Sequence, residues 1–293
     1  MKGPMRIGAK HGRGKPVFSF EFFPPKTDEG TKNLLATVAD LRDVLAPDFV
    51  SVTNGAGGST RARTLALVAR IQRELDITAM AHLTCVGATE AALMDEVRGL
   101  TQAGIENILA LRGDAPQDTG VFSPTAGGFA HASDLAAFLQ ANFDVEIGGA
   151  CYPEGHVEST DRETDLDWTV HKVRQGVDFL ITQLFLDNAD YFAFLNRARD
   201  RGIRVPIVPG IMPITNVAQV ERFTKMCGAR IPPELQARLR RFQDDPAAVM
   251  ALGIEHAIVQ CRGLLEGGAP GLHFYTLNKS WATRSILAAV RRV

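Results

Sequence analysis

Short β-rich runs alternate with longer amphipathic segments, and this alternation limits the possible folds more than any other feature of the chain. The β-rich runs cover residues 17–23, 49–53, 78–84, 107–111, 146–152, 179–184, 205–209 and 272–277. The helix-like segments cover residues 29–45, 60–74, 89–103, 133–142, 161–175, 189–201, 216–226 and 280–292. Such alternation predicts an α/β fold with a parallel sheet covered by helices. Eight units in 293 residues fit a (β/α)8 TIM barrel.

A doubly wound sheet is the main alternative to a barrel. Its usual dinucleotide motif, Gly-x-Gly-x-x-Gly, follows none of the eight runs. Pro232 and Pro246 open two further helical segments that reach about Glu266, so we expect a helical insertion before the last strand. The insertion could pack on the barrel or on another subunit, and we expect a homo-oligomer. We expect residues 1–15 to be a flexible N-terminal tail and residues 16–293 to be one domain.

The overall composition excludes several classes of protein. The formal net charge is -1, so we expect binding neither to nucleic acid nor to a membrane surface. The four cysteines form no Cys-x-x-Cys pair, which favours free thiols and a cytoplasmic protein. Neither metal-ligand spacing nor a Gly-x-Ser-x-Gly motif occurs, so we expect no metal site and no serine hydrolase. The sequence shows neither an apolar run of the roughly 18 residues that span a membrane nor a secretory signal.

Glu21 is the most informative polar residue, because it lies in the first β-rich run among four phenylalanines. Pro24 and Pro25 end this strand, which places Glu21 near its carboxyl end. Apolar surroundings raise the pKa of a carboxyl group. A protonated Glu21 could therefore act as a general acid near neutral pH. The alternative is a rim glutamate paired with Lys or Arg, and this segment alone leaves both open.

Other polar residues lie at the ends of the predicted strands, where barrel enzymes build their active sites. They are Thr53, His82, Thr84, Arg112, Gly113, Asp114, Tyr152, Gln183, Tyr275 and Asn278. Each also has a structural interpretation: Thr53 could belong to a turn, Asp114 could cap a loop and His82 could be a core histidine. Gln183 is harder to explain structurally, because a buried amide needs partners. Together these residues predict a site at the barrel mouth.

Two predicted helices add candidate ligand-binding residues. Asp161, Asp165, Trp168 and Lys172 recur at helical spacing, so they share one face of the fifth helix. That face could simply be solvated, or His171 and Lys172 could bind a phosphate. On the seventh helix, Gln219 and Phe223 point the same way, and Phe223 is either a core residue or a flat contact for a planar ligand.

The chain resembles the flavin-dependent 5,10-methylenetetrahydrofolate reductases of the short bacterial type. Eight segments from residue 17 to the C-terminus carry the resemblance, in the order found in the family. They are SFEFFPPK at 19–26, VT at 52–53 before GAGG at 55–58, HLTC at 82–85, ALRGD at 110–114, YPEGH at 152–156, TQLFLD at 182–187, PGIMP at 209–213 and FYTLN at 274–278.

The resemblance implies a barrel enzyme that holds FAD non-covalently. A ping-pong reaction is implied, in which NADH or NADPH reduces the flavin and methylenetetrahydrofolate is then reduced to 5-methyltetrahydrofolate. Glu21 matches the general acid, and Asp114 the aspartate that lies near both flavin and folate. Gln183, Gln219, Phe223 and Lys279 match substrate contacts. Matches to FAD contacts are Thr53, His82, Arg112, Gly113, Asp114, Ala132, Tyr152, His156, Asp165, Trp168, His171 and Lys172.

Four positions depart from the family pattern and bear on cofactor affinity and donor choice. Asn54 stands where the family usually has Tyr, and Trp168 stands where it has Asn. His171 stands where Arg is common, and Lys279 replaces an Arg that contacts the folate side chain. Two other functions remain open: a folate-reducing subunit that takes electrons from a partner protein, and another barrel flavoenzyme of the proline-dehydrogenase kind. The chain shows no counterpart of the regulatory domain of longer relatives, so we expect no inhibition by S-adenosylmethionine.

Overall fold

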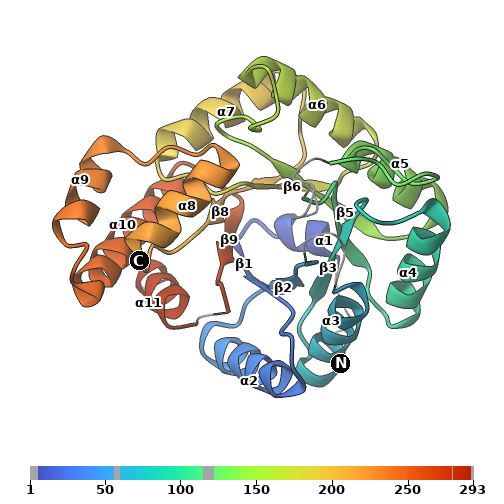
Figure 1. The fold of residues 1–293 in the computed structure, drawn as a ribbon, viewed down its shortest axis with the longest axis horizontal. Coiled ribbons are helices and arrows are strands. Elements are labelled where there is room, and N and C mark those ends of the chain that lie inside the picture. The colour runs from blue at the N-terminus through green and yellow to red at the C-terminus, as the bar shows by residue number, and fades with distance from the viewer. Residues whose placement is uncertain (1–5, 56–59, 115–121, 279, 292–293) are drawn as a thin grey trace.

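A computed structural model describes residues 6–55, 60–114, 122–278 and 280–291 (Figure 1). Within these residues, parallel strands form one sheet that curls into a barrel, with helices around the outside. The strands are β1 Val17–Phe22, β2 Phe49–Val52, β3 Ala79–Thr84, β4 Asn107–Leu111, β5 Glu146–Cys151, β6 Phe179–Thr182, β7 Ile207–Val208, β8 Gly210–Ile211 and β9 Gly271–Tyr275. The helices are α1 Ile7–His11, α2 Asp28–Leu45, α3 Arg61–Leu75, α4 Glu90–Gln102, α5 Ala132–Asn142, α6 Arg162–Arg174, α7 Asn188–Asp200, α8 Val217–Cys227, α9 Pro233–Arg241, α10 Pro246–Glu266 and α11 Ser280–Val290. The predicted (β/α)8 barrel is confirmed.

The seventh strand of the barrel is interrupted. β7 pairs with β6 and β8 pairs with β9, and Pro209 alone separates the two halves. Proline has no N–H for a ladder hydrogen bond, but its carbonyl accepts one from the backbone N–H of His273 at 3.0 Å. The sequence predicted this strand over 205–209, whereas the structure begins it at Ile207 and continues it past the proline to Ile211.

Local sequence explains where most helices begin. Side chains at the N-cap positions accept hydrogen bonds from backbone N–H groups of the first turn, which stabilises a helix start. These N-caps are Thr27, Thr89, Asp161, Asp187, Asn216 and Asp245. The predicted insertion is confirmed as helices α9 and α10, which lie between β8 and β9 in the chain.

Helix α10 corrects one expectation from the sequence. It is long and apolar enough, by length and composition, to cross a membrane, although the sequence analysis found no such run. Here it packs against α11 and α7, and residues such as Leu252, Ala257 and Leu264 are buried. Core helices of folded domains can be equally long and apolar, so the length and composition of α10 are weak evidence for a membrane span.

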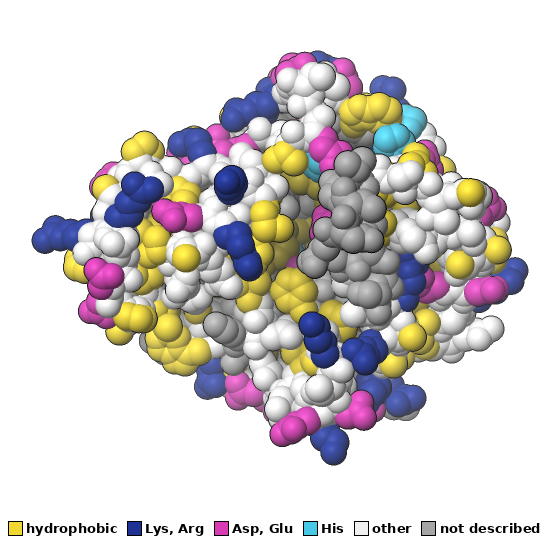
Figure 2. Space-filling view, viewed as in Figure 1, with side chains coloured by type: hydrophobic (Ala, Val, Ile, Leu, Met, Phe, Trp, Pro, Cys, Tyr) yellow, Lys and Arg dark blue, Asp and Glu magenta, His cyan; other side chains and the backbone are white. Residues whose placement is uncertain are grey.

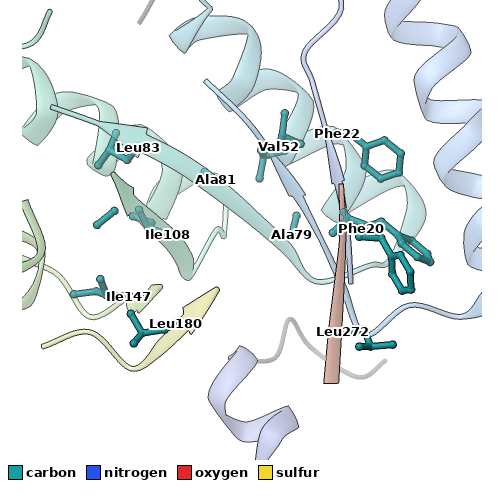
Figure 3. Packing of buried hydrophobic residues seen from close by; sticks show 14 of the residues in the cluster. Phe20, Phe22, Val52, Ala79, Ala81, Leu83, Ile108, Ile147, Leu180 and Leu272 are labelled. Atoms are coloured by element: carbon teal, nitrogen blue, oxygen red, sulfur yellow. The ribbon is translucent and has the colours of Figure 1, made fainter. Parts of the chain in front are cut away.

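The two faces of the strands have different surroundings, because successive side chains of a strand point in opposite directions. Phe18, Phe20 and Phe22 of β1 belong to the same apolar cluster as Leu34 and Val38 of α2. Phe20 and Phe22 lie on the same side of the strand (Figure 3). Residues that point into the barrel, in the part farther from the carboxyl ends of the strands, form a separate apolar layer together with one residue of helix α1. Its members are Ile7, Val17, Phe49, Met80, Leu109, Phe179, Ile181 and Val208.

Helix α1 closes the end of the barrel opposite the carboxyl ends of the strands. The backbone N–H of Ile7 donates to Asn107 at 3.0 Å, and that of Gly8 donates to Glu146 at 2.6 Å. Asn107 and Glu146 are the first residues of β4 and β5. Ile7 is fully buried in the apolar layer. The segment expected to be a flexible tail therefore contributes a packed helix to the barrel floor.

Candidate active site

Two cavities that share lining residues lie at the carboxyl ends of the strands. The first measures about 380 Å³ and the second about 270 Å³. Figure 2 shows this face of the molecule, on which hydrophobic side chains border the central region. The first cavity is lined by the predicted residues Glu21, Thr53, His82, Arg112, Gly113, Asp114, Tyr152, His156, Gln183 and Phe223. The second is lined by Arg112, Ala132, Tyr152, His156, Asp165, Trp168 and Lys172. The structure thus brings most of the predicted site residues together.

Three predicted site residues stand apart from this set. Among the described residues, Gln219 and His171 are outside the lining of both cavities. Gln219 instead accepts a hydrogen bond from the Thr215 hydroxyl at 3.4 Å. The ring of His171 meets that of Trp168 edge-on, with centroids 5.8 Å apart. Lys279 lies outside the described residues, and so do positions 56–58 of the predicted glycine-rich segment.

Glu21 is held between two histidines rather than among phenylalanines. Its Oε2 lies 3.3 Å from Nε2 of His273 and 3.4 Å from Nε2 of His82. The other ring nitrogen of His273, Nδ1, lies 2.8 Å from the hydroxyl of Ser19. Ser19, His273 and Glu21 therefore form a continuous hydrogen-bonded chain inside the barrel. His273 was not predicted as a site residue, although its position two residues before Tyr275 places both on one face of the strand.

The electrostatics of Glu21 overturn the predicted rise of its pKa. Burial raises the pKa, but the positive charge available at His82 and the hydrogen bond from His273 outweigh it and leave the pKa below its ordinary value. Burial also lowers the pKa of His82 to about 4. A neutral His82 offers an N–H dipole rather than a full charge. The pKa of Glu21 is lowered because two imidazole nitrogens lie within 3.4 Å of one carboxylate oxygen.

Several buried polar atoms near Glu21 lack a hydrogen-bond partner among the described residues. They are the hydroxyl oxygens of Ser51 and Thr53, both amide atoms of Asn54, and Nε2 of His82. Ser51 pairs in register with Glu21, and the other three line the first cavity. Because unsatisfied buried polar atoms are costly, this wall is suited to a ligand with several donors and acceptors. Asn54 was noted in the sequence only as a departure from the family pattern.

The second cavity combines charged groups with aromatic rings. Arg112 makes two hydrogen bonds to Glu158, at 2.5 and 2.8 Å, and Lys172 donates to the carbonyl of Ala150 at 2.6 Å. Burial raises the pKa of Asp165 and lowers that of Lys172, while their mutual attraction opposes both shifts. Trp168 is 51% exposed and stacks on His131, with ring centroids 5.4 Å apart. Cations beside an open aromatic surface suit a phosphorylated compound that carries a planar base.

Of the residues predicted to share the face of the fifth helix, Asp161 has a structural role. It is the N-cap of α6, and its carboxylate accepts from the backbone N–H groups of Glu163 and Thr164. Asp165, Trp168 and Lys172 line the second cavity. The structure therefore places three of the four residues at helical spacing in the cavity lining and the fourth at the start of the helix.

Comparison with known proteins identifies the family. The family model for methylenetetrahydrofolate reductase matches residues 6–291. The chain belongs to this family. It is 37% identical to the 5,10-methylenetetrahydrofolate reductase of Escherichia coli over 268 residues, which cover 92% of this chain and 88% of the relative. It is 40% identical to a probable methylenetetrahydrofolate reductase (NADH) of Oryza sativa over 300 residues, covering 98% of this chain.

The chain spans about half the length of several of these relatives, including 50% of the rice protein. Among solved structures, an uncharacterized protein from Clostridium thermocellum that binds two copies of 5-methyl-5,6,7,8-tetrahydrofolic acid aligns over 96% of both chains, with a TM-score of 0.63 and 19% identity. A dihydropteroate synthase from Xanthomonas albilineans aligns with a TM-score of 0.52 and 14% identity. These structural likenesses support the barrel fold.

Proposed function

We propose that the protein reduces 5,10-methylenetetrahydrofolate to 5-methyltetrahydrofolate, with non-covalent FAD as cofactor and NADH or NADPH as electron donor. The observation that carries the proposal is the pair of adjoining cavities with Glu21 in the wall of the first. Family membership supports the reaction. The Clostridium thermocellum neighbour binds the proposed product, and the similarity to the probable methylenetetrahydrofolate reductase (NADH) of rice favours NADH over NADPH.

The two cavities fit the two ends of FAD. The first offers the unsatisfied polar atoms of Thr53 and His82, which can bind the polar edge of a flavin ring. Arg112 and Lys172 can balance the negative charge of a pyrophosphate, and the ring of Trp168 offers a stacking surface for the adenine. Gly113, Asp114, Ala132, Tyr152, His156 and Asp165 complete the proposed contacts. His171 would act from outside the lining, through its contact with Trp168.

Bound FAD would supply the hydride chemistry, which no side chain can provide. The reaction consumes one hydride and one proton, and Glu21 is the group proposed to supply the proton. It would protonate N10 of the folate as the bond from N10 to the bridging carbon breaks. The iminium left at N5 then accepts the hydride, which gives the methyl group. Because both substrates must reach the same flavin ring, they would use the first cavity in turn, in a ping-pong sequence.

The lowered pKa of Glu21 sets a condition on this role. In the open cavity the two imidazoles favour the carboxylate, so Glu21 must gain a proton before folate chemistry begins. Entry of a folate displaces water, which strengthens the burial effect that already raises the pKa. His273 and Ser19 can orient the carboxyl group through their hydrogen bonds. Asp114, Gln183 and Phe223 line the same cavity and are proposed to bind the folate, together with Gln219 and Lys279.

The experiment that tests the function follows the flavin spectrum of the purified protein under anaerobic conditions. We expect NADH to bleach the spectrum and methylenetetrahydrofolate to restore it with formation of 5-methyltetrahydrofolate. A flavin that responds to neither NADH nor NADPH, yet is reoxidised by the folate after chemical reduction, would favour a partner protein as donor. A reduced flavin that methylenetetrahydrofolate cannot reoxidise would refute the proposed function.

A further inference from the structure

The turn that follows β9 holds the end of β1 through three side-chain hydrogen bonds. The hydroxyl of Thr276 donates to the carbonyl oxygen of Glu21 at 2.6 Å. The side-chain oxygen of Asn278 accepts from the backbone N–H of Phe23 at 2.8 Å, and its amide nitrogen donates to the carbonyl of Phe23 at 2.9 Å. The amide of Asn278 therefore binds both polar backbone groups of Phe23. Phe23 directly follows β1, at a point where the sheet no longer fixes the chain.

The backbone of this turn is unusual. Leu277 has a φ of 51° and Asn278 a φ of 58°, so both adopt the left-handed conformation. Asparagine tolerates this region, whereas leucine rarely enters it. Such conformations persist where the surrounding structure imposes them, and they are frequent at ligand-binding sites. Leu277 lines the first cavity, so the turn takes part in the wall of the proposed site.

The residue held by this turn is an aromatic ring at the cavity mouth. Phe23 lines the first cavity and is 42% exposed, in contrast to the fully buried Phe20 and Phe22 of the same strand. Its backbone is thus held firmly while its ring remains accessible. Phe23 also follows Glu21 by two residues, so it lies on the same face of the chain and roughly 6–7 Å nearer the mouth.

We propose that Phe23 receives the aminobenzoyl ring of the folate substrate and that Asn278 is its positioning residue. The inference rests on the proposed function, and the chemistry of the substrate supports it. In methylenetetrahydrofolate the aminobenzoyl ring is attached directly to N10, the atom that Glu21 is proposed to protonate. With N10 beside Glu21, the next group toward the mouth is this ring. Phe23 then forms a second aromatic wall in the cavity that Phe223 also lines.

The test measures the affinity of the FAD-loaded protein for 5-methyltetrahydrofolate, from the change in flavin absorbance on titration. We expect Phe23→Ala to weaken binding roughly tenfold, as loss of an aromatic contact predicts, and Phe23→Tyr to bind within about twofold of wild type because it keeps the ring. The rate of flavin reduction by NADH should fall by a smaller factor than the folate affinity, because both substrates use this cavity but the nicotinamide lacks the aminobenzoyl group. Phe242→Ala is the matched control, because Phe242 is 39% exposed at the end of α9.

Asn278→Gly tests the positioning role separately. Glycine adopts a φ of 58° readily, so the turn can keep its shape while both hydrogen bonds to Phe23 are lost. We expect the KM for methylenetetrahydrofolate to rise several-fold with kcat retained. A variant that melts at a lower temperature but has an unchanged KM would limit Asn278 to a structural role and overturn that part of the proposal.

The outcomes separate this inference from the proposed function. If wild-type protein neither binds 5-methyltetrahydrofolate nor reduces methylenetetrahydrofolate, the proposed function fails, and the assignment of Phe23 fails with it. If wild-type protein does both, unchanged folate affinity in Phe23→Ala refutes the assignment alone. Equal losses in folate affinity and in NADH-driven flavin reduction would also refute it, because they would make Phe23 a general part of the cavity wall.

Discussion

Replacing Glu21 with glutamine tests the proposed chemistry most directly. Glutamine has nearly the same size and can still hydrogen-bond to His273, 3.3 Å away, but it has no proton to give. We expect the reduction of methylenetetrahydrofolate to slow by about 10²–10⁴-fold, the usual contribution of a positioned general acid. This corresponds to about 3–5 kcal/mol of lost transition-state stabilisation. The rate of flavin reduction by NADH should change by less than about threefold, because that step needs no general acid.

The structure places the expected loss toward the upper part of this range. Among the described residues that line the first cavity, Asp114 is the one other carboxylic acid, and it is exposed at the rim. A replacement proton would therefore have to come from the solvent or from Asp114. Stopped-flow measurement of each half-reaction separates the two steps, and folate binding is measured in parallel to confirm that the site is intact.

Glu146→Gln is the matched control for the loss of a buried carboxylate. Glu146 is 7% exposed and lies at the opposite end of the barrel, where it accepts the N–H of Gly8. We expect both of its half-reactions to remain near wild-type rates. The assignment of Glu21 as the acid is refuted if Glu21→Gln reduces folate at the wild-type rate, or if both half-reactions fall by the same factor.

Three further predictions concern stability and cofactor binding. Burial lowers the pKa of His82 to about 4, so His82 binds a proton more tightly in the unfolded chain than in the folded protein. The contribution of neutral His82 to the free energy of unfolding is complete above about pH 6.5. It is lost as the pH falls toward 4, by up to about 3 kcal/mol. Urea unfolding at pH 7 and pH 5 should therefore differ less in His82→Gln than in wild type, and an equal difference would contradict this origin. A side chain at Gly8 would overlap Oε1 of Glu146, so we expect Gly8→Ala to cost about 1–3 kcal/mol in urea unfolding, whereas Gly12→Ala, at the end of α1 with no close contact, should cost less. Trp168→Ala should weaken FAD binding roughly tenfold in a fluorescence titration of the flavin-free protein, while Trp281→Ala, on α11, should leave it unchanged.

The barrel could be predicted from the sequence because its signal is local and repeated. Each β-rich run and each amphipathic segment carries its own period, and errors at single boundaries do not alter the order of the elements. The interrupted strand shows where this reasoning fails. From the sequence alone, the seventh strand is expected to end at Pro209. Residues 210 and 211 belong to the barrel because β8 pairs with β9, which the sequence does not reveal.

The surroundings of Glu21 could not be predicted in the same way. The sequence placed it among phenylalanines, but adjacent residues of a strand lie on opposite faces. The group that hydrogen-bonds to its carboxylate, His273, is 252 residues away in the chain. The pKa of Glu21 therefore depends on contacts across neighbouring strands. The direction of its pKa shift could not be derived from residues 17–23 alone. By contrast, the position of Glu21 at the carboxyl end of β1 followed correctly from Pro24 and Pro25.

The barrel interior is divided into layers with different tasks. Large apolar residues such as Phe49, Met80 and Phe179 fill its lower part, and helix α1 closes the floor beneath them. Above them, Ser19, Glu21, His82 and His273 replace the branched residues that usually fill such barrels. Polar side chains inside a barrel reduce the apolar packing available for stability. The apolar layer above helix α1 supplies packing of that kind, and the ring of Phe49 in this layer stacks on His273, with centroids 6.1 Å apart. Glu21 and His82 of the polar layer line the cavity at the mouth, where the proposed chemistry takes place.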